Sequence, residues 1–152
     1  MPVSPDLAWQ LADDIGLVYA LSLSVSEAEL EGEGVRSSEF IAMVILTSFP
    51  DGLSQTAWGR YQGVSRQRAH AISKTLVSGD LITVEKRGRE SVIRLTELGE
   101  EVVERLRPAI SLRLSAMMDA LSALEAQTLS RLLKKVVGHA AHMEAAADKR
   151  AV

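Results

Sequence analysis

The stretch LSQTAWGRYQGVSRQRAHAISKTLV, residues 53–77, contains two short helix-forming segments on either side of one glycine. Leu53 and Ser54 are expected to open the first helix, with the serine as its cap, because the hydroxyl accepts a hydrogen bond from an unpaired amide. Gly63 is expected to end that helix, since glycine adopts the left-handed conformation without strain. Ser65 then caps a second helix. Two short helices joined by a tight glycine turn predict a helix-turn-helix.

The second of these helices has an apolar side and a basic side. The residues expected on its buried side, at three- and four-residue spacing, are Ala69, Ile72, Leu76 and Val77. The residues then expected to lie away from the core are Arg66, His70, Ser73 and Lys74, with Gln67 and Ala71 on the flank. A recognition helix enters the major groove with its first turns, where arginine pairs with guanine and glutamine with adenine.

This helix therefore supplies most of the expected DNA contacts. The set is Ser65, Arg66, Gln67, Arg68, His70 and Lys74. Within it, we expect base-edge contacts from Arg66, Gln67 and His70, and mainly phosphate contacts from Arg68 and Lys74. For each residue alone, a solvated surface is the better explanation. Their occurrence together on one capped helix, beside a basic hairpin, favours DNA binding.

The preceding helix offers a phosphate site at its beginning. Its first residues are Ser54, Gln55 and Thr56, whose free amides are expected to bind a backbone phosphate. Helix capping alone explains Ser54 equally well.

Two β-compatible runs, residues 81–86 and 91–95, follow the second helix. The glycine-bearing connection between them has hairpin length, so the sequence predicts a β-hairpin wing. Arg87 and Arg89 lie at its tip, where we expect them to reach a neighbouring minor groove. The alternative is that these charges only protect an edge strand.

Amphipathic helices are expected on both sides of this central part. A first helix starts at Ser4 and Pro5 and runs to about Leu30, although the alternating residues 21–25 are equally compatible with a strand, and a short second helix starts near Ser38. Thr96 is expected to cap a long helix that Pro108 kinks. The apolar stripe of that long helix is Leu98, Val102, Leu106, Ile110, Met117 and Leu121. Ser122 and Glu125 form a capping box before a last helix, whose apolar face is Leu129, Leu132, Leu133, Val136, Val137 and Ala140, with Lys134 and Lys135 opposite.

These terminal stripes are larger than a winged helix of about sixty residues can bury. We therefore expect a homodimer with an intertwined helical dimerisation domain, although folding back on the same chain is the alternative. The expected fold is mainly α with a small β-hairpin wing. Its parts are an N-terminal dimerisation helix and linker at 1–34, a winged helix-turn-helix DNA-binding domain at 35–98, and C-terminal dimerisation helices at 99–152.

The charge distribution agrees with this arrangement. The whole chain has a net charge of −3, and residues 1–50 carry eight acids against one base. Residues 58–94 carry eight bases against three acids, a local charge of +5. A basic segment inside an acidic chain attracts phosphate locally and limits indiscriminate binding elsewhere.

Several function classes are not expected. The chain has no cysteine, which excludes disulfides and thiolate metal sites within it, and we expect no cofactor. It lacks a nucleophile motif, a phosphate-binding loop and a carboxylate pair with catalytic spacing, so we do not expect an enzyme. It also lacks a long apolar run and a secretory signal, so we expect a cytoplasmic protein.

The segment from Val35 to Gly99 resembles the MarR family of winged-helix transcriptional regulators, and the flanking helices resemble it more weakly. The motifs that carry the resemblance, in order, are Leu53-Ser54-Gln55, Gly63-Val64-Ser65, Leu76 with Asp80-Leu81-Ile82, and Leu95-Thr96-Glu97-Leu98-Gly99. The sequence departs from the family pattern at three places. Trp58 and Gly59 stand where the family usually has leucine and alanine, and Asp80 stands where it has a glycine before the wing. At the wing tip, Arg89 matches the arginine of the family's Asp-x-Arg motif, but Arg87 replaces the aspartate.

The resemblance implies a sequence-specific repressor of transcription. Such a protein binds an inverted repeat in double-stranded DNA as a homodimer, and a small aromatic or phenolic ligand releases it. One alternative is a metal-sensing winged helix of the ArsR kind, suggested weakly by His139, His142 and the nearby Glu144. Another alternative is a winged-helix protein-interaction module that does not touch DNA.

Overall fold

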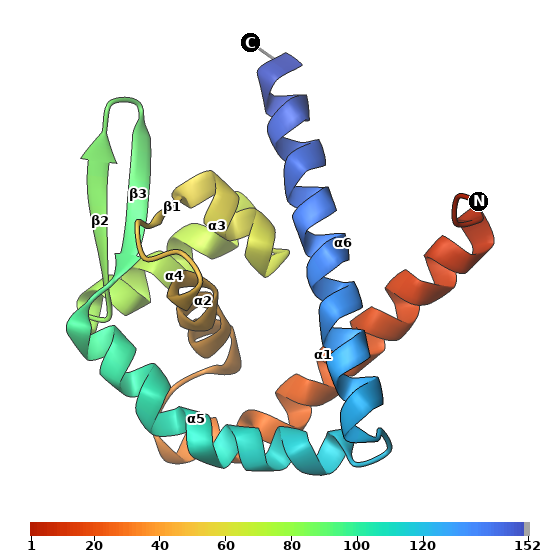
Figure 1. Ribbon diagram of the computed structural model, residues 1–152. Helices are drawn as coiled ribbons and strands as arrows, with labels where there is room; N and C mark the ends of the chain where they lie inside the picture. The colour runs from red at the N-terminus through yellow and green to blue at the C-terminus, as the bar shows by residue number, and fades with distance from the viewer. Residues whose placement is uncertain (151–152) are drawn as a thin grey trace. The chain divides into compact units, whose positions relative to one another are not determined.

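The computed structural model describes residues 1–150, and their side chains except those of 144, 145 and 147–150 (Figure 1). Within this range the chain forms six helices and three strands. In chain order they are α1 (Pro5–Gly32), α2 (Ser37–Thr47), β1 (Leu53–Ser54), α3 (Gln55–Gln62), α4 (Arg66–Ser78), β2 (Ile82–Arg87), β3 (Glu90–Leu95), α5 (Glu97–Met118) and α6 (Ala123–Arg150). The mainly α fold with a small β-hairpin wing is thus confirmed. No helix in the described range is long and apolar enough to cross a membrane.

The strands form one antiparallel sheet in the order β1-β3-β2. The β2–β3 pairing runs from Ile82 opposite Leu95 to Arg87 opposite Glu90, so Gly88 and Arg89 form the turn at the wing tip. Leu53 was expected to open a helix, and that prediction is wrong, because it pairs with Ile93 in the sheet. Only Ser54, the second strand residue, caps α3 as expected, with its hydroxyl accepting from the amide of Ala57 at 3.2 Å.

The chain divides into two compact units, of which the first is Met1–Leu114 and the second begins at Ser115. The core of the first unit lies where α2, α3 and the sheet meet. Trp58 is fully buried there and donates from Nε1 to the carbonyl of Ala42 at 2.9 Å. Its neighbour Gly59 leaves room for the Cβ atom of Ala69 on α4. The missing side chain at Gly59 thus lets α3 and α4 approach closely, while Trp58 packs toward α2.

The connection from α4 to the wing depends on one residue with left-handed backbone. Asp80 has φ +55° and is the sole non-glycine residue in the described chain with positive φ. It therefore adopts the conformation that the glycine of the MarR pattern supplies at low cost. Thr96 ties this turn to α5: its hydroxyl donates to the Asp80 carbonyl at 2.6 Å and accepts from the amide of Gly99 at 3.0 Å.

The beginning of α5 is closely covered by the same turn. A Cβ atom at Gly99 would overlap the carbonyl oxygen of Leu81 and would lie 2.9 Å from Cδ2 of Leu95. The buried residues of α5 are Gly99, Val102, Val103, Leu106 and Ile110. Leu98, which the periodicity placed in this stripe, is 46% exposed. The helix continues through Pro108.

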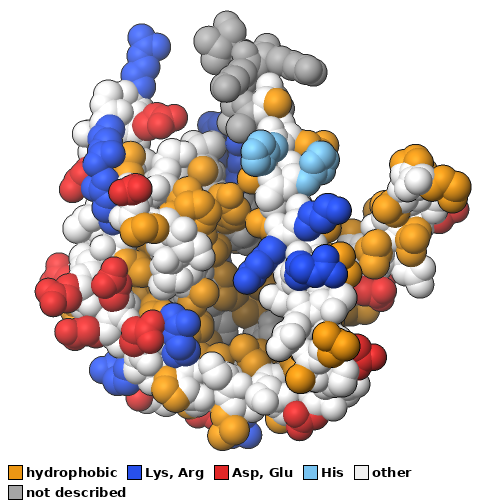
Figure 2. Space-filling view, viewed as in Figure 1, with side chains coloured by type: hydrophobic (Ala, Val, Ile, Leu, Met, Phe, Trp, Pro, Cys, Tyr) orange, Lys and Arg blue, Asp and Glu red, His pale blue; other side chains and the backbone are white. Residues whose placement is uncertain are grey.

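Helix α1 is covered only near its end, where Ser26 and Leu30 are buried. Ion pairs join that end to α5, from Glu29 to Arg113 at 2.8 Å and from Glu33 to Arg105 at 3.2 Å. The first sixteen residues of α1 are exposed throughout, including apolar ones (Figure 2).

The second unit contains the end of α5 and α6. The predicted capping box is confirmed: the amide of Ser122 donates to Glu125 at 2.8 Å, and the amide of Glu125 donates back to the serine hydroxyl at 3.4 Å. An apolar groove of about 560 Å³ runs along the unit. Its lining is Met118, Leu121, Ala126, Leu129, Ser130, Leu133, Lys134, Val137 and Gly138. Figure 2 shows Lys, Arg and His side chains on the viewed face of α6.

Candidate nucleic-acid interface

Helix α4 is held by its own cap and by a broad buried side. Ser65 is the N-cap, and its hydroxyl accepts from the amide of Arg68 at 3.2 Å, as the sequence predicts. The buried residues of α4 are Ala69, Ile72, Ser73 and Leu76. Val77, expected in the core, is 42% exposed.

Ser73 is the clear correction on this helix. It was expected to lie away from the core, yet it is only 5% exposed. Helix α4 packs against α2, α3 and β2 at once, so its buried arc is wider than its apolar residues alone indicate. A small side chain such as serine fits at the edge of that arc.

Six polar residues, from the N-cap of α4 to Lys74, are exposed. They are Ser65, Arg66, Gln67, Arg68, His70 and Lys74. Within residues 1–150, no described carboxylate pairs with Arg66, Arg68 or Lys74. Three cations are therefore available on the exposed part of α4, with Arg66 and Arg68 at its two edges, where attraction to phosphate is not offset by an intrachain partner.

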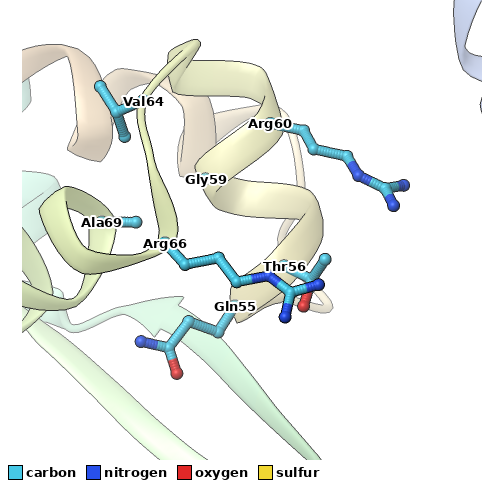
Figure 3. A pocket seen from close by; sticks show the side chains of 7 residues that line it. All are labelled: Gln55, Thr56, Gly59, Arg60, Val64, Arg66 and Ala69. Atoms are coloured by element: carbon cyan, nitrogen blue, oxygen red, sulfur yellow. The ribbon is translucent and has the colours of Figure 1, made fainter.

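A depression of about 320 Å³ lies between the beginnings of α3 and α4 (Figure 3). Its lining is Gln55, Thr56, Gly59, Arg60, Val64, Arg66 and Ala69. Arg66 extends over it from the start of α4, and Gln55 and Thr56 line it from the first turn of α3. Unpaired amides at a helix N-terminus, together with a guanidinium, suit a phosphate oxygen.

Arg60 belongs to this site and was missed from the sequence. It lines the depression, and its guanidinium points outward in Figure 3. The available signal was its spacing, because Arg60 follows Thr56 by four residues and so lies on the same side of α3.

Helices α3 and α4 are joined by one side-chain contact on this surface. Nε2 of Gln55 lies 3.4 Å from Nδ1 of His70. Both residues were predicted from the sequence as DNA contacts, but their contact with each other was not predicted.

The wing is basic at its tip and braced at its base. Arg94 donates to the carbonyl of Asp51 at 3.0 Å and pairs with Glu85 at 2.9 Å, so it is committed to the structure. Glu85 also lies 3.9 Å from Arg87, whereas no described carboxylate pairs with Arg89. Both tip arginines are exposed.

The histidines of α6 do not form a described metal site. Among the described residues, no cluster of three potential ligands is present. His142 donates from Nδ1 to the carbonyl of Gly138 at 2.7 Å. The side chain of Glu144, the third residue of the metal alternative, lies outside the described residues.

Comparison with known proteins relates this architecture to one group of solved structures. No family model and no curated protein matches the sequence. A MarR family regulator from Silicibacter pomeroyi matches with TM-score 0.70 and 21% identity, over 82% of this chain and 86% of that one. The oxidized form of MarR from E. coli matches with TM-score 0.69 and 18% identity, over 90% and 96%. The chain has the MarR fold.

A third structure of this fold contains a ligand. It is a Mycobacterium tuberculosis MarR family protein in complex with p-aminosalicylic acid, with TM-score 0.67 and 21% identity, over 83% of this chain and 97% of that one. The resemblance inferred from the helix-turn-helix and wing motifs is thus confirmed at the level of fold, and at these identities the likeness extends to fold alone.

Proposed function

We propose that this protein is a transcriptional regulator that binds double-stranded DNA sequence-specifically, with residues 35–98 as its DNA-binding part. The observation that carries the proposal is the exposed surface of α4. There Arg66, Arg68 and Lys74 have no carboxylate partner among the described residues, and α4 stands on a winged-helix fold.

The roles follow from position. The first turns of α4 enter the major groove, so Arg66, Gln67 and His70 read base edges. Arg68 and Lys74 bind phosphates, and Ser65 holds the helix start. Residues 54–56 at the beginning of α3 bind a neighbouring phosphate beside the depression, and the wing arginines Arg87 and Arg89 reach the adjacent minor groove.

The terminal helices make the protein a homodimer in this proposal. The beginning of α1 and the apolar face of α6 expose side chains that a soluble monomer rarely leaves in contiguous patches. A two-fold dimer presents two copies of α4 about 34 Å apart, one duplex turn, and so selects an inverted repeat.

A small aromatic or phenolic effector then releases the repressor. Structures of the same fold contain p-aminosalicylic acid and salicylic acid, both in the Mycobacterium tuberculosis protein. Such an effector acts only if it binds the two states of the dimer with different affinity. These states differ in the distance between the two copies of α4, which fits the operator in one state and not in the other.

Selection from a random duplex pool tests the proposal. The expected result is an inverted repeat whose affinity, followed by fluorescence anisotropy, falls steeply as salt rises, because bound phosphates release counterions. Salicylate added to that complex is expected to lower the affinity. If the selection recovers no preferred duplex, sequence-specific DNA recognition is contradicted. Binding of a partner protein with an affinity that does not change with salt would favour the interaction-module alternative.

A further inference from the structure

The contact between Gln55 and His70 joins the two helices of the helix-turn-helix on their exposed surface. Gln55 is the first residue of α3, and His70 lies on the second turn of α4, fifteen residues later. Nε2 of the glutamine and Nδ1 of the histidine are 3.4 Å apart. His70 lies four residues after Arg66 and four before Lys74, so all three share the exposed side of α4.

This pairing of atoms fixes the direction of the hydrogen bond. The amide nitrogen of glutamine has two protons and no free lone pair, so it donates. Nδ1 of His70 must then accept, which requires a neutral ring whose single proton is on Nε2. The ring therefore presents a donor at Nε2, and the tautomer is set by a residue on the other helix.

A donor at this position has a defined counterpart in the major groove. Guanine presents the acceptors N7 and O6 there, adenine presents N7 and thymine presents O4, whereas cytosine presents only the N4 amino donor. A ring with its proton on Nδ1 would offer an acceptor at Nε2 and would suit cytosine or the amino group of adenine instead. The tautomer thus decides which base edge the histidine matches.

We propose that Gln55 is a positioning residue that holds His70 as an Nε2–H donor, and that the pair selects against cytosine at one position of the operator. The inference rests on the proposed DNA-binding function and deepens it, because it assigns base preference to a contact between α3 and α4. Gln55 acts through His70 and need not touch a base itself.

The test is a double-mutant cycle on base discrimination. The variants are Gln55→Met, which keeps length but removes the donor, His70→Ala, and the double variant; Gln127→Met, exposed on α6, is the matched control. The readout is the ratio of affinities for the selected operator and for an operator in which cytosine replaces the base at the His70 position. Each single change is expected to lower this ratio about fivefold, the worth of one hydrogen bond, and the double change no further.

A second readout needs no DNA. The chain has only three histidines, so ¹⁵N spectra of the imidazoles of full-length protein resolve His70 by its loss in His70→Ala. Above about pH 8, where ordinary histidines are neutral, the parent is expected to show the Nε2–H form and Gln55→Met a mixture.

The two readouts separate the possible failures. An Nδ1–H ring in the parent overturns the inference even if the operator is bound. An effect of Gln55→Met that persists in the His70→Ala background also overturns it, because Gln55 would then act on its own. Absence of duplex binding by the parent contradicts the proposed function and the selection against cytosine with it, while the spectra still decide the tautomer.

Discussion

The winged-helix part of this chain covers most of its apolar side chains, whereas the beginning of α1 and helix α6 leave most of theirs exposed. Trp58, Met43 and Ile93 are fully buried between α2, α3 and the sheet. Trp9 on α1 is 78% exposed, and Val136 on α6 is 59% exposed. Apolar periodicity therefore has two meanings: apolar residues covered within the chain specify the fold, and uncovered ones form the surface that we propose for dimerisation.

The largest expected effect comes from a charge placed on the exposed apolar face of α6. Val136→Glu is expected to convert the proposed dimer to a monomer, with dimerisation weakened at least about a hundredfold, because a carboxylate without a partner is costly to bury. Light scattering at micromolar concentration measures the mass.

Gln127→Glu is the matched control, since Gln127 is exposed two and a half turns before Val136, hence on the opposite side of α6, and the substitution adds the same single negative charge. The control is expected to remain dimeric. A parent protein that is already monomeric would refute the dimer outright.

A covered position is expected to respond through stability instead. Gly99→Ala is expected to lower the free energy of unfolding by about 3 kcal/mol, because the new methyl group meets the Leu81 carbonyl and the Leu95 side chain. Urea denaturation followed by circular dichroism measures the change.

Gly16→Ala is the control for this substitution in the uncovered region. A Cβ atom at Gly16 meets nothing within 4 Å, so alanine is expected to be neutral or to stabilise α1 by up to about 1 kcal/mol. Equal effects at the two glycines would contradict the contrast between covered and uncovered regions.

The turn before the wing offers a smaller change in the opposite direction. Asp80→Gly is expected to raise the free energy of unfolding by about 0.5 kcal/mol, since glycine relieves the left-handed strain at φ +55° but gains freedom in the unfolded chain. The bond from Thr96 is kept, because it goes to the backbone carbonyl. A loss of stability in thermal melts would show that the aspartate side chain holds the turn.

The smallest expected effect is a pH dependence at the start of α6. Hydrogen bonds from the Ser122 side chain and backbone lower the pKa of Glu125 below its ordinary value. The resulting stabilisation is present above the pKa of the unfolded chain and is lost as pH falls through the lower pKa of the folded state. Glu125→Gln is expected to remove this acid-side loss, measured as helicity by circular dichroism. An unchanged acid profile in the variant would mean that the capping box contributes nothing measurable.

Features set by local chemistry could be predicted from the sequence. Ser54 and Ser65 cap the beginnings of α3 and α4, and Gly63 ends α3 in a left-handed turn. These features depend on neighbouring residues only. The wing turn at Gly88 follows equally from its glycine and the flanking β-compatible runs.

Features set by distant packing could not be predicted. Leu53 is a strand residue because Ile93, forty positions later, pairs with it. Ser73 is buried because three elements converge on α4. The contact of Gln55 with His70 depends on how α3 and α4 cross, which no local pattern specifies. Contacts of the candidate surface with DNA stay predictions.

The most direct test of the account is the affinity of the selected operator for Arg66→Ala and Arg68→Ala, measured by fluorescence anisotropy at fixed salt. Arg107→Ala is the control, because Arg107 pairs with Glu104 at 2.7 Å on α5, outside the proposed DNA surface. The account predicts that each α4 variant binds at least about tenfold more weakly than the parent and that the control binds like the parent. Parent-like binding by both α4 variants would contradict the assignment of α4 as the recognition helix.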